Sequence, residues 1–501
     1  MTHTSEQLAV GSPLSEEATQ GLGSRDITRR SFLLTVGALG LAASTVLSGC
    51  AGSDDEVASE AEDISTEVDN ATPTDIRSRI LGVDAEIELG DGTLAPLINF
   101  DNAATTPAFL EVAAEIEAQL AYYGSIGRGW GQKSAHSTEI YEAGRMAVMD
   151  FVNADQDKNT VFYVNNTTDG LNKLSSALIE SKEDIVLTTR MEHHANDLNW
   201  RLRGTTIYAE VDELGRLKLD EVERLLKEND VKIVSVTAAS NVTGYVNDVH
   251  AIAKLAHANG ALIVVDGAQI VAHREFSMTG ATPEENIDFF VFSAHKMYSP
   301  YGSGAVVGPI DQLNEHLPVF YGGGMVHVVT DYTQSWLDAP DRYEAGSPNY
   351  PGVVGMIQMT YILKDIGFDY IVEHEQKMLR KVFDGLSQID GVILYGDTEK
   401  IDDKVGIVTF NIDGMYCSDV AEALAQKRGI AVRQAAFCAH PYVFRLLGIP
   451  DAEIVATEND EDFVMPGMVR VSFGIYNNDE EADALIETVR VIAEEAKNSE
   501  Q

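Results

Sequence analysis

Short apolar runs alternate with longer amphipathic segments along the chain from about residue 98 onward. The segments 219–227 and 249–258 have the spacing of amphipathic helices, and Asn259-Gly260 ends the second of them. Continuous apolar strands separated by helices predict an α/β fold with a parallel or mixed sheet covered on both faces. Six runs have the length and composition of buried strands, at 161–164, 184–188, 233–238, 261–265, 288–292 and 304–308.

The pattern changes beyond about residue 355. A helical stretch over 354–386 precedes strand-like runs at 406–411 and 469–473, and helical spacing returns at 419–427 and 480–496. We therefore expect a large domain over residues 80–355 and a smaller C-terminal α+β domain over residues 356–501.

Residues 1–50 have the arrangement of an export signal. Arg29-Arg30 precedes a stretch that stays apolar or small, and Leu47-Ser48-Gly49-Cys50 closes it. This order is typical of a twin-arginine signal that ends in a lipidated cysteine, and the apolar run is short for a spanning helix. We expect recognition by the twin-arginine export machinery, lipidation of Cys50 and a place on the outer face of the cell membrane. An uncleaved membrane anchor is the alternative.

Residues 51–79 are rich in Asp, Glu, Ser, Ala and Thr and poor in large apolar side chains. Such a composition cannot offset its own ordering entropy. We expect an acidic, disordered tether between the signal and the folded body.

Composition sets limits on partners and metals. The chain has 79 Asp and Glu against 36 Lys and Arg, a net charge of −43, which repels nucleic acids. Because salt screens this self-repulsion, we expect a halophile-like, salt-rich habitat, with an ordinary acidic protein as the alternative. The three cysteines form no disulfide framework, and no Cys/His spacing indicates a metal site.

Two segments that follow apolar runs carry chemistry. Ser293-Ala294-His295-Lys296 comes after 288–292, where a desolvated lysine favours its neutral amine and Schiff-base formation. Asp266 directly follows the run 261–265, at the carboxyl edge of the sheet where α/β proteins bind ligands. Its carboxylate could pair with the pyridine nitrogen of pyridoxal phosphate (PLP). The alternatives are that Lys296 is a solvated loop residue and that Asp266 caps the next helix or turn.

Two further segments have residues suited to binding a phosphate group and to stacking on the ring of a cofactor. Thr167 and Thr168 stand where a helix should begin, and hydroxyls with backbone N–H groups there bind anions, although a plain N-cap is the alternative. His193 and His194 are neighbours whose side chains point apart. We therefore favour an aromatic that stacks on a cofactor over a metal site.

The order of these segments resembles class V aminotransferase-fold enzymes, and most closely the cysteine desulfurase/selenocysteine lyase family, from about residue 98 to the end. The resemblance implies a fold-type I PLP-dependent transferase, with a mostly parallel seven-stranded sheet in the large domain and a smaller C-terminal α+β domain. The motifs are Asn102-Ala103-Ala104, Thr167-Thr168-Asp169-Gly170, Glu192-His193-His194-Ala195-Asn196, Ser240-Asn241-Val242-Thr243-Gly244, Asp266-Gly267-Ala268-Gln269 and Ser293-Ala294-His295-Lys296.

The resemblance also implies roles for individual residues. Lys296 would hold PLP, Asp266 would pair with the ring nitrogen, and His193 would stack on the ring. Gln269 would reach the ring oxygen, and Asn241 would lie near that oxygen or the substrate carboxylate. The phosphate would be bound by Thr167, Thr168, Ser293, His295 and, from the neighbouring subunit of a homodimer, Ser347.

Cys438 lies in a segment that resembles the one carrying the family's sulfur-accepting cysteine. Its thiolate would attack the substrate sulfur and form a persulfide, while Arg433 and Arg470 would bind the substrate carboxylate. Two departures stand out: Ala435-Ala436-Phe437 replaces a usual Gly-His-His, and Gly127–Gly131 replaces a histidine-containing loop. The alternative is that Cys438 is a small apolar side chain that only fills space and has no catalytic role.

These observations predict a PLP-dependent enzyme that removes sulfur or selenium from an L-cysteine-type amino acid to give alanine. The alternatives are another class V PLP reaction on a different amino acid, such as epimerisation, amine transfer or C–S lysis, and a lipid-anchored binding protein without catalysis.

Overall fold

The computed structural model describes residues 73–127, 129–459 and 463–499. The predicted export signal, its Cys50 and most of the predicted tether lie outside these residues. The prediction of a tether through residue 79 is wrong at its end, because Pro73–Ser78 form helix α2 and Ile76 is fully buried. Among the described helices, none is both long enough and apolar enough to cross a membrane.

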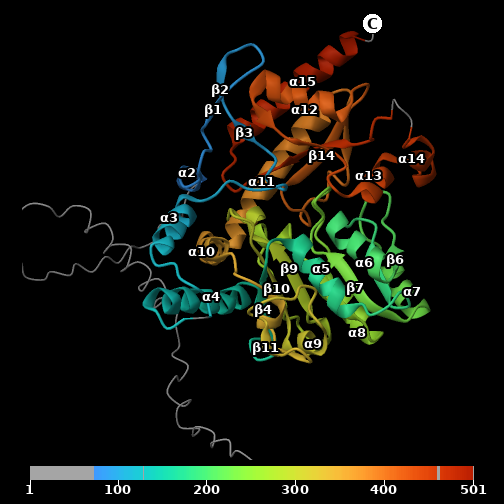
Figure 1. Cartoon of the computed structure of the whole chain (residues 1–501). Helices are drawn as coiled ribbons and strands as arrows, with labels where there is room; N and C mark the ends of the chain where they lie inside the picture. The colour runs from blue at the N-terminus through green and yellow to red at the C-terminus, as the bar shows by residue number, and fades with distance from the viewer. Residues whose placement is uncertain (1–72, 128, 460–462, 500–501) are drawn as a thin grey trace, which may run out of the picture. The chain divides into compact units, whose positions relative to one another are not determined.

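A seven-stranded sheet organises the larger part of the chain (Figure 1), in the order β4-β10-β9-β8-β7-β5-β6. Strand β10 runs antiparallel to both of its neighbours, and the other pairs are parallel. The predicted α/β fold is therefore confirmed. The strands are β4 (Asn159–Val164), β5 (Ile185–Thr189), β6 (Thr205–Ala209), β7 (Val231–Thr237), β8 (Leu262–Asp266), β9 (Phe289–Ser293) and β10 (Gly304–Pro309).

The six apolar runs correspond to all of these strands except β6. That strand lies at the edge of the sheet, and only its last residue, Ala209, is fully buried, so it lacks the continuous apolar pattern of a central strand. Strand β9 shows the opposite case, because all five of its residues are buried.

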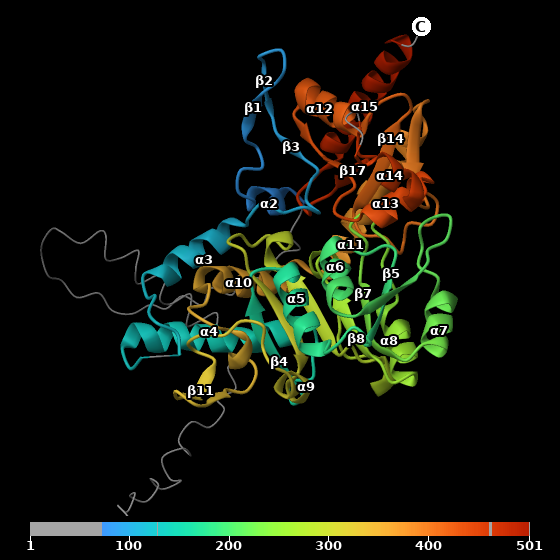
Figure 2. The same ribbon diagram turned by 45° about the vertical axis from the view of Figure 1, so that its right-hand side comes forward.

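Helices pack on both faces of this sheet (Figure 2). Apolar side chains of α5 (Thr167–Leu178) and α6 (Leu198–Arg203) join those of the central strands in one core cluster. On the opposite face, α4 (Gln132–Phe151) and α10 (Tyr350–Ile366) meet at Gly144, where a Cβ would lie 2.2 Å from Ile357 and 2.7 Å from the Tyr163 hydroxyl. The other helices are α3 (Leu110–Leu120), α7 (Leu219–Glu228), α8 (Val249–Ala258) and α9 (Ile310–Glu315).

A second, four-stranded antiparallel sheet, in the order β13-β14-β17-β16, forms the smaller domain. Its core contains Phe383, Phe410, Val471 and Leu485. The strands are β13 (Val392–Tyr395), β14 (Ile407–Ile412), β16 (Arg433–Ala435) and β17 (Met468–Ser472). The helices are α11 (Phe368–Ser387), α12 (Cys417–Arg428), α13 (His440–Leu447), α14 (Asp451–Thr457) and α15 (Asp479–Ser499).

The helical stretch expected over 354–386 is helical, but it is divided between two helices. Two helices meet at Gly367, whose φ of 85° lies in the region that favours glycine. Helix α10 packs against α3 and α4, whereas α11 packs against α15. The change of domain therefore falls at Gly367, later than the expected residue 356.

The start of the folded body also belongs to the smaller domain. Strand β3 (Ile98–Asn99) pairs in parallel with β15 (Ile430–Ala431), and Ile98 and Phe100 lie in the smaller domain's core. A short hairpin, β1 (Glu86–Glu88) with β2 (Leu94–Pro96), precedes it, and a second hairpin joins β11 (Val326–Val329) to β12 (Gln334–Trp336). The segment after β3 then runs between the two sheets and helps to form the site.

Candidate active site

A cavity of about 270 Å³ opens at the carboxyl ends of β8 and β9, beneath the cysteine-bearing loop of the smaller domain. The structure brings together here every predicted cofactor and substrate residue except Ser347. The lining residues are Ala103, Ala104, Asn166, Thr167, Thr168, His193, Ala195, Thr237, Ala239, Asn241, Asp266, Ala268, Gln269, Ser293, His295, Lys296, Arg433, Phe437, Cys438 and Arg470.

Asp266 ends strand β8 and is 3% exposed. Its Oδ1 accepts a hydrogen bond from the Ala268 N–H at 2.9 Å. Burial raises the pKa of Asp266, while the Ala268 N–H and Lys296 act in the opposite direction. Gly267 is required beside it, since a Cβ there would lie 2.1 Å from the Phe290 ring. The carboxylate therefore needs a cation to complete its surroundings.

Lys296 lies in the single turn η5 (Ala294–Lys296) that directly follows the buried strand β9. Burial lowers its pKa to about 8, and Asp266 opposes that shift. A lysine with this pKa has a substantial neutral fraction near pH 8, and the neutral amine is the form that attacks a carbonyl carbon. The predicted Schiff-base residue is thus held in a nucleophilic state.

The N-terminus of α5 faces the same cavity. The helix is capped by Asn166, whose Oδ1 accepts from the Asp169 N–H at 2.9 Å. Thr167 is bound to Ser293, because its N–H donates to the Ser293 Oγ at 2.7 Å and the two hydroxyl oxygens are also 2.7 Å apart. Burial, with Lys296, lowers the pKa of His295 to about 4, so its ring is neutral. Hydroxyls, N–H groups and a helix N-terminus form an anion site here.

His193 has a fixed ring orientation. Its Nδ1 accepts a hydrogen bond from the Ala195 N–H at 3.0 Å, which leaves the ring proton on Nε2. Burial, followed by the charge of Lys296, lowers the pKa of His193 to about 3. A neutral, immobilised imidazole on the cavity wall is suited to stacking against a flat ring.

Gln269 and Asn241 are both engaged with backbone carbonyls. The Gln269 Nε2 donates to the Ala103 oxygen at 2.9 Å, and the Asn241 Nδ2 donates to the Phe437 oxygen at 2.8 Å. Each side chain therefore holds a piece of the cavity wall. For Asn241 this use of the amide was not anticipated from the sequence.

Arg470 is a buried cation, 3% exposed, on strand β17. Its NH1 donates to the Asn241 carbonyl at 2.9 Å and its NH2 to Asp101 Oδ1 at 3.1 Å. Burial lowers its pKa to about 10, and Asp101 opposes this. The buried Nε has no hydrogen-bond partner among the described residues. Arg470 nevertheless lines the cavity, and its positive charge suits a ligand carboxylate.

Cys438 is exposed and borders the cavity, and Arg433 lies exposed at its rim. The backbone before and at the cysteine is left-handed, with φ of 83° at Ala435, 49° at Phe437 and 56° at Cys438. Such conformations cost about 1–3 kcal/mol each in non-glycine residues, so the surroundings must hold this loop in place.

Ser347 lies in a different cavity, of about 230 Å³, with Tyr141, Tyr163 and Glu344 among its walls. Glu344 Oε1 accepts from the Tyr163 N–H at 2.7 Å, and both of its oxygens accept from Arg145, at 2.7 and 3.0 Å. The loop that carries Ser347 is thus anchored at its base and exposes Ser347. Within one subunit the structure does not bring Ser347 to the cofactor residues.

Several residues of the site were missed in the sequence. Asp101 and Phe437 contact Arg470, His194 contacts Cys438, and Glu192 is buried directly before His193. Glu192 accepts hydrogen bonds from the Thr189 hydroxyl at 2.5 Å and the Asn196 amide at 2.7 Å. Glu192 could have been found from the sequence, because it belongs to the motif Glu192-His193-His194-Ala195-Asn196. Within the described ranges, no three metal-ligating side chains gather.

This set of groups fits pyridoxal phosphate. The buried Asp266 matches the cationic ring nitrogen, Lys296 matches the aldehyde, His193 matches the ring face, and the α5 N-terminus matches the phosphate. When bound, PLP would supply an electron sink for the carbons next to a substrate amino group. The fold and the site together define a PLP-dependent enzyme of fold type I.

Comparisons with known proteins agree with this class. Residues 98–485 match the family Aminotransferase class-V, and the chain belongs to that family. It is 32% identical to a probable cysteine desulfurase of Halalkalibacterium halodurans, over 78% of this chain and 92% of that protein. It is 33% identical to a cysteine desulfurase of Haloferax volcanii, over 80% of this chain and 90% of that protein.

Solved structures show the same similarity. The apo cysteine desulfurase of Thermococcus onnurineus NA1 aligns with a TM-score of 0.71 and 29% identity, over 79% of this chain and 95% of that one. A cysteine desulfurase of Escherichia coli aligns with a TM-score of 0.69 and 26% identity, over 85% of this chain and 99% of that one. The predicted fold type and cofactor are confirmed.

Lys296→Ala should abolish the absorbance of lysine-bound PLP, because the described residues that line the cavity include no second lysine. The measurement is the absorbance spectrum of the purified protein with PLP supplied. Lys158→Ala, at a lysine side chain that is 75% exposed, is the control and should keep the wild-type spectrum. An unchanged spectrum in Lys296→Ala would refute the assignment of the cofactor residues.

Proposed function

We propose that this enzyme is a cysteine desulfurase that converts L-cysteine, or the corresponding selenium amino acid, to alanine and leaves the sulfur on Cys438 as a persulfide. The observation that carries the proposal is the position of Cys438, an exposed thiol that borders the same cavity as Lys296 and Asp266. Relatives named as cysteine desulfurases, aligned over most of their length, support it.

The overall reaction balances without an added oxidant. The bond between the substrate Cβ and its sulfur breaks, and a sulfur–sulfur bond forms with Cys438. The substrate thiol keeps its hydrogen, so the product on Cys438 is a persulfide. The proton of the Cys438 thiol is balanced by the one that the substrate Cβ gains in becoming the methyl group of alanine.

Residues of this chain would bind and orient the substrate. The guanidinium charges of Arg470 and Arg433, both of which line the cavity, suit the α-carboxylate. The Lys296 amine, with its pKa lowered to about 8, can take a proton from Cα and return one to Cβ. Phe437 replaces the family's usual histidine and places its ring 5.0 Å from the guanidinium carbon of Arg470. It therefore supplies an apolar wall in place of a proton donor.

The wild-type protein, with PLP, reductant and molar salt, should release alanine and sulfide from L-cysteine. Cys438→Ser should lower that release by roughly 10²-fold or more, because an alcohol oxygen does not accept the sulfur. Quantified alanine and sulfide are the readouts, and Cys417→Ser is the matched control at a cysteine with no assigned role. If wild-type protein binds PLP but releases no sulfur, the reaction is another one of the class V enzymes.

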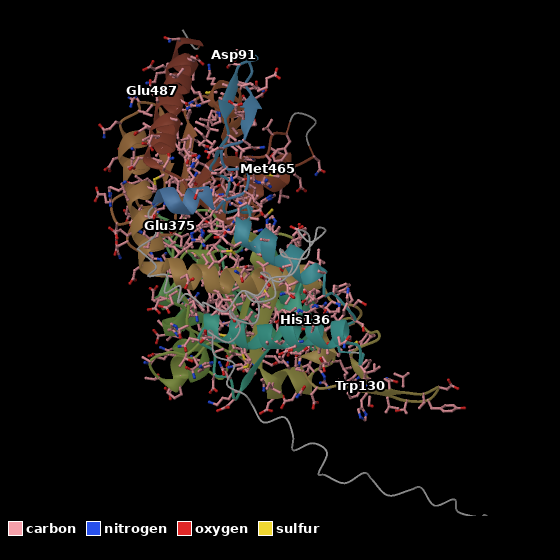
Figure 3. All side chains as sticks on the ribbon, turned by 90° about the vertical axis from the view of Figure 1, so that its left-hand side faces the viewer. Asp91, Trp130, His136, Glu375, Met465 and Glu487 are labelled. Carbon is pink, nitrogen blue, oxygen red and sulfur yellow. The ribbon has the colours of Figure 1, made fainter. Side chains whose placement is uncertain are left out.

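We also propose that the active enzyme is a homodimer in which Ser347 of each subunit serves the phosphate of the other. Ser347 is exposed on an anchored loop away from its own subunit's site. Nearby, Tyr301, Phe320 and Tyr321 are each more than 60% exposed. The hairpin formed by β11 and β12 extends from the body in Figure 3 and exposes Val329 and Tyr332. Exposed apolar groups at one place are typical of an interface.

Mixed oligomers test the shared site. Ser347→Glu should weaken PLP binding by about tenfold or more through repulsion of the phosphate, and Lys296→Ala should form no lysine-bound PLP. When the two variants are co-produced with different tags, a mixed dimer contains one site with Lys296 and a partner's Ser347 intact. Tight PLP absorbance should therefore return in the mixed dimer. If Ser347 acted within its own subunit, no recovery would occur.

We further propose that the protein is exported through the twin-arginine route and anchored by lipid on Cys50, on the strength of the order of arginines, apolar run and Leu47-Ser48-Gly49-Cys50. Replacing Arg29 and Arg30 with lysines should retain the protein inside the cell, and Cys50→Ala should release it from the membrane fraction. Fractionation and the intact mass of the mature N-terminus are the readouts. Normal export of the arginine variant would contradict the route.

A further inference from the structure

The loop before and at Cys438 needs support from outside itself. Ala435, Phe437 and Cys438 all have positive φ, which L residues rarely adopt. Within the loop, the Ala439 N–H donates to the Ala436 oxygen at 2.8 Å, a single turn contact. A loop with three such residues and one internal hydrogen bond would relax if nothing else held it.

Groups of the cavity hold the N-terminal side of the cysteine. The Asn241 amide binds the Phe437 carbonyl at 2.8 Å, and the Phe437 ring faces the buried Arg470. Both partners belong to the site described above. They fix the residue before Cys438 but not Cys438 itself.

His194 holds the C-terminal side. Its backbone N–H donates to the Cys438 carbonyl at 2.7 Å, and its Nε2 accepts from the His440 N–H at 3.3 Å. The two imidazole rings also meet edge to face, with centroids 4.5 Å apart. His194 thus contacts the backbone of the cysteine loop twice, at Cys438 and at His440.

The side-chain contact requires a neutral ring, because Nε2 accepts only when it carries no proton. Burial, followed by the charge of His440, lowers the pKa of His194, and Asp197 acts in the opposite direction. Arg201, which is ion-paired with Asp197, lowers it further. This shift favours the neutral ring that the contact requires.

His194 directly follows His193, and their ring centroids are 6.3 Å apart. The His193 ring lines the cofactor cavity, while the His194 ring contacts the cysteine loop. We propose that His194 is a positioning residue that holds Cys438 in its left-handed conformation and so sets the distance between the thiol and the cofactor ring. The proposal rests on the proposed function only in making Cys438 the sulfur acceptor.

His194→Ala in the full-length holoenzyme removes the ring and its hydrogen bond with the His440 N–H but keeps the backbone bond to the Cys438 carbonyl, so it tests the side-chain part of this assignment. We expect kcat for alanine release from L-cysteine to fall about tenfold or more, with KM and the absorbance of bound PLP unchanged. We also expect alkylation of Cys438 by iodoacetamide, followed by mass spectrometry of its peptide, to accelerate about threefold or more as the loop loosens. His194→Gln places an acceptor oxygen near the position of Nε2 and should recover most of both properties.

His440→Ala is the matched control, because it keeps the backbone N–H that His194 binds and removes only the ring. It should stay within about twofold of wild type in both measurements. Unchanged alkylation and kcat in His194→Ala would overturn the proposal, and so would loss of bound PLP in that variant or an equal loss in His440→Ala. If the wild type releases no alanine, the proposed function fails while the alkylation rates still decide the role of His194.

Discussion

The burial of ionisable groups around one cavity is the constraint on which the rest of the site depends. Burial raises the pKa of Asp266 and lowers those of Lys296, His193 and His295, so each group is pushed towards its neutral form. Lys296, whose own pKa is lowered, is the cation that acts on Asp266, and the described residues at the phosphate end offer hydroxyls, N–H groups and the neutral ring of His295. Such a cavity favours a ligand that brings its own cationic ring nitrogen and its own anion, and pyridoxal phosphate has both.

Backbone strain is concentrated in two segments, the one that follows Lys296 and the one that carries Cys438. In the part of the chain that the structure describes, six non-glycine residues have positive φ, and five of them follow Lys296 or lead to Cys438. They are Tyr298, Tyr301, Ala435, Phe437 and Cys438. Tyr298 is held because its hydroxyl accepts from the Ile475 N–H at 2.9 Å, a contact between the two domains. The rigid sheet and the inter-domain contacts together support conformations that would be unfavourable alone.

The sequence was informative where local patterns carry the structure. Continuous apolar runs marked the five interior strands and edge strand β4, and the residues at the ends of the parallel strands marked the cofactor cavity, because parallel strands share a carboxyl edge. Edge strand β6 and the break at Gly367 lacked such a signal. Asp101 and His194 could not be assigned either, since their roles depend on partners at 470 and 438 that are distant in sequence. The lipidation site and the export signal stay predictions, as they lie outside the described residues.

The pairing of β3 with β15 has a consequence for how the enzyme acquires its cofactor. Ile98 pairs with Ile430, and Asn102 donates to the Ser472 carbonyl at 3.0 Å, so the segment beside the cavity is completed by residues far along the chain. During synthesis, the large sheet can form before these partners leave the ribosome, but the wall at Ala103 and Ala104 cannot. The wall of the cofactor cavity at Ala103 is therefore completed only after residues 430 and 472 have been synthesised, so it depends on folding of the smaller domain.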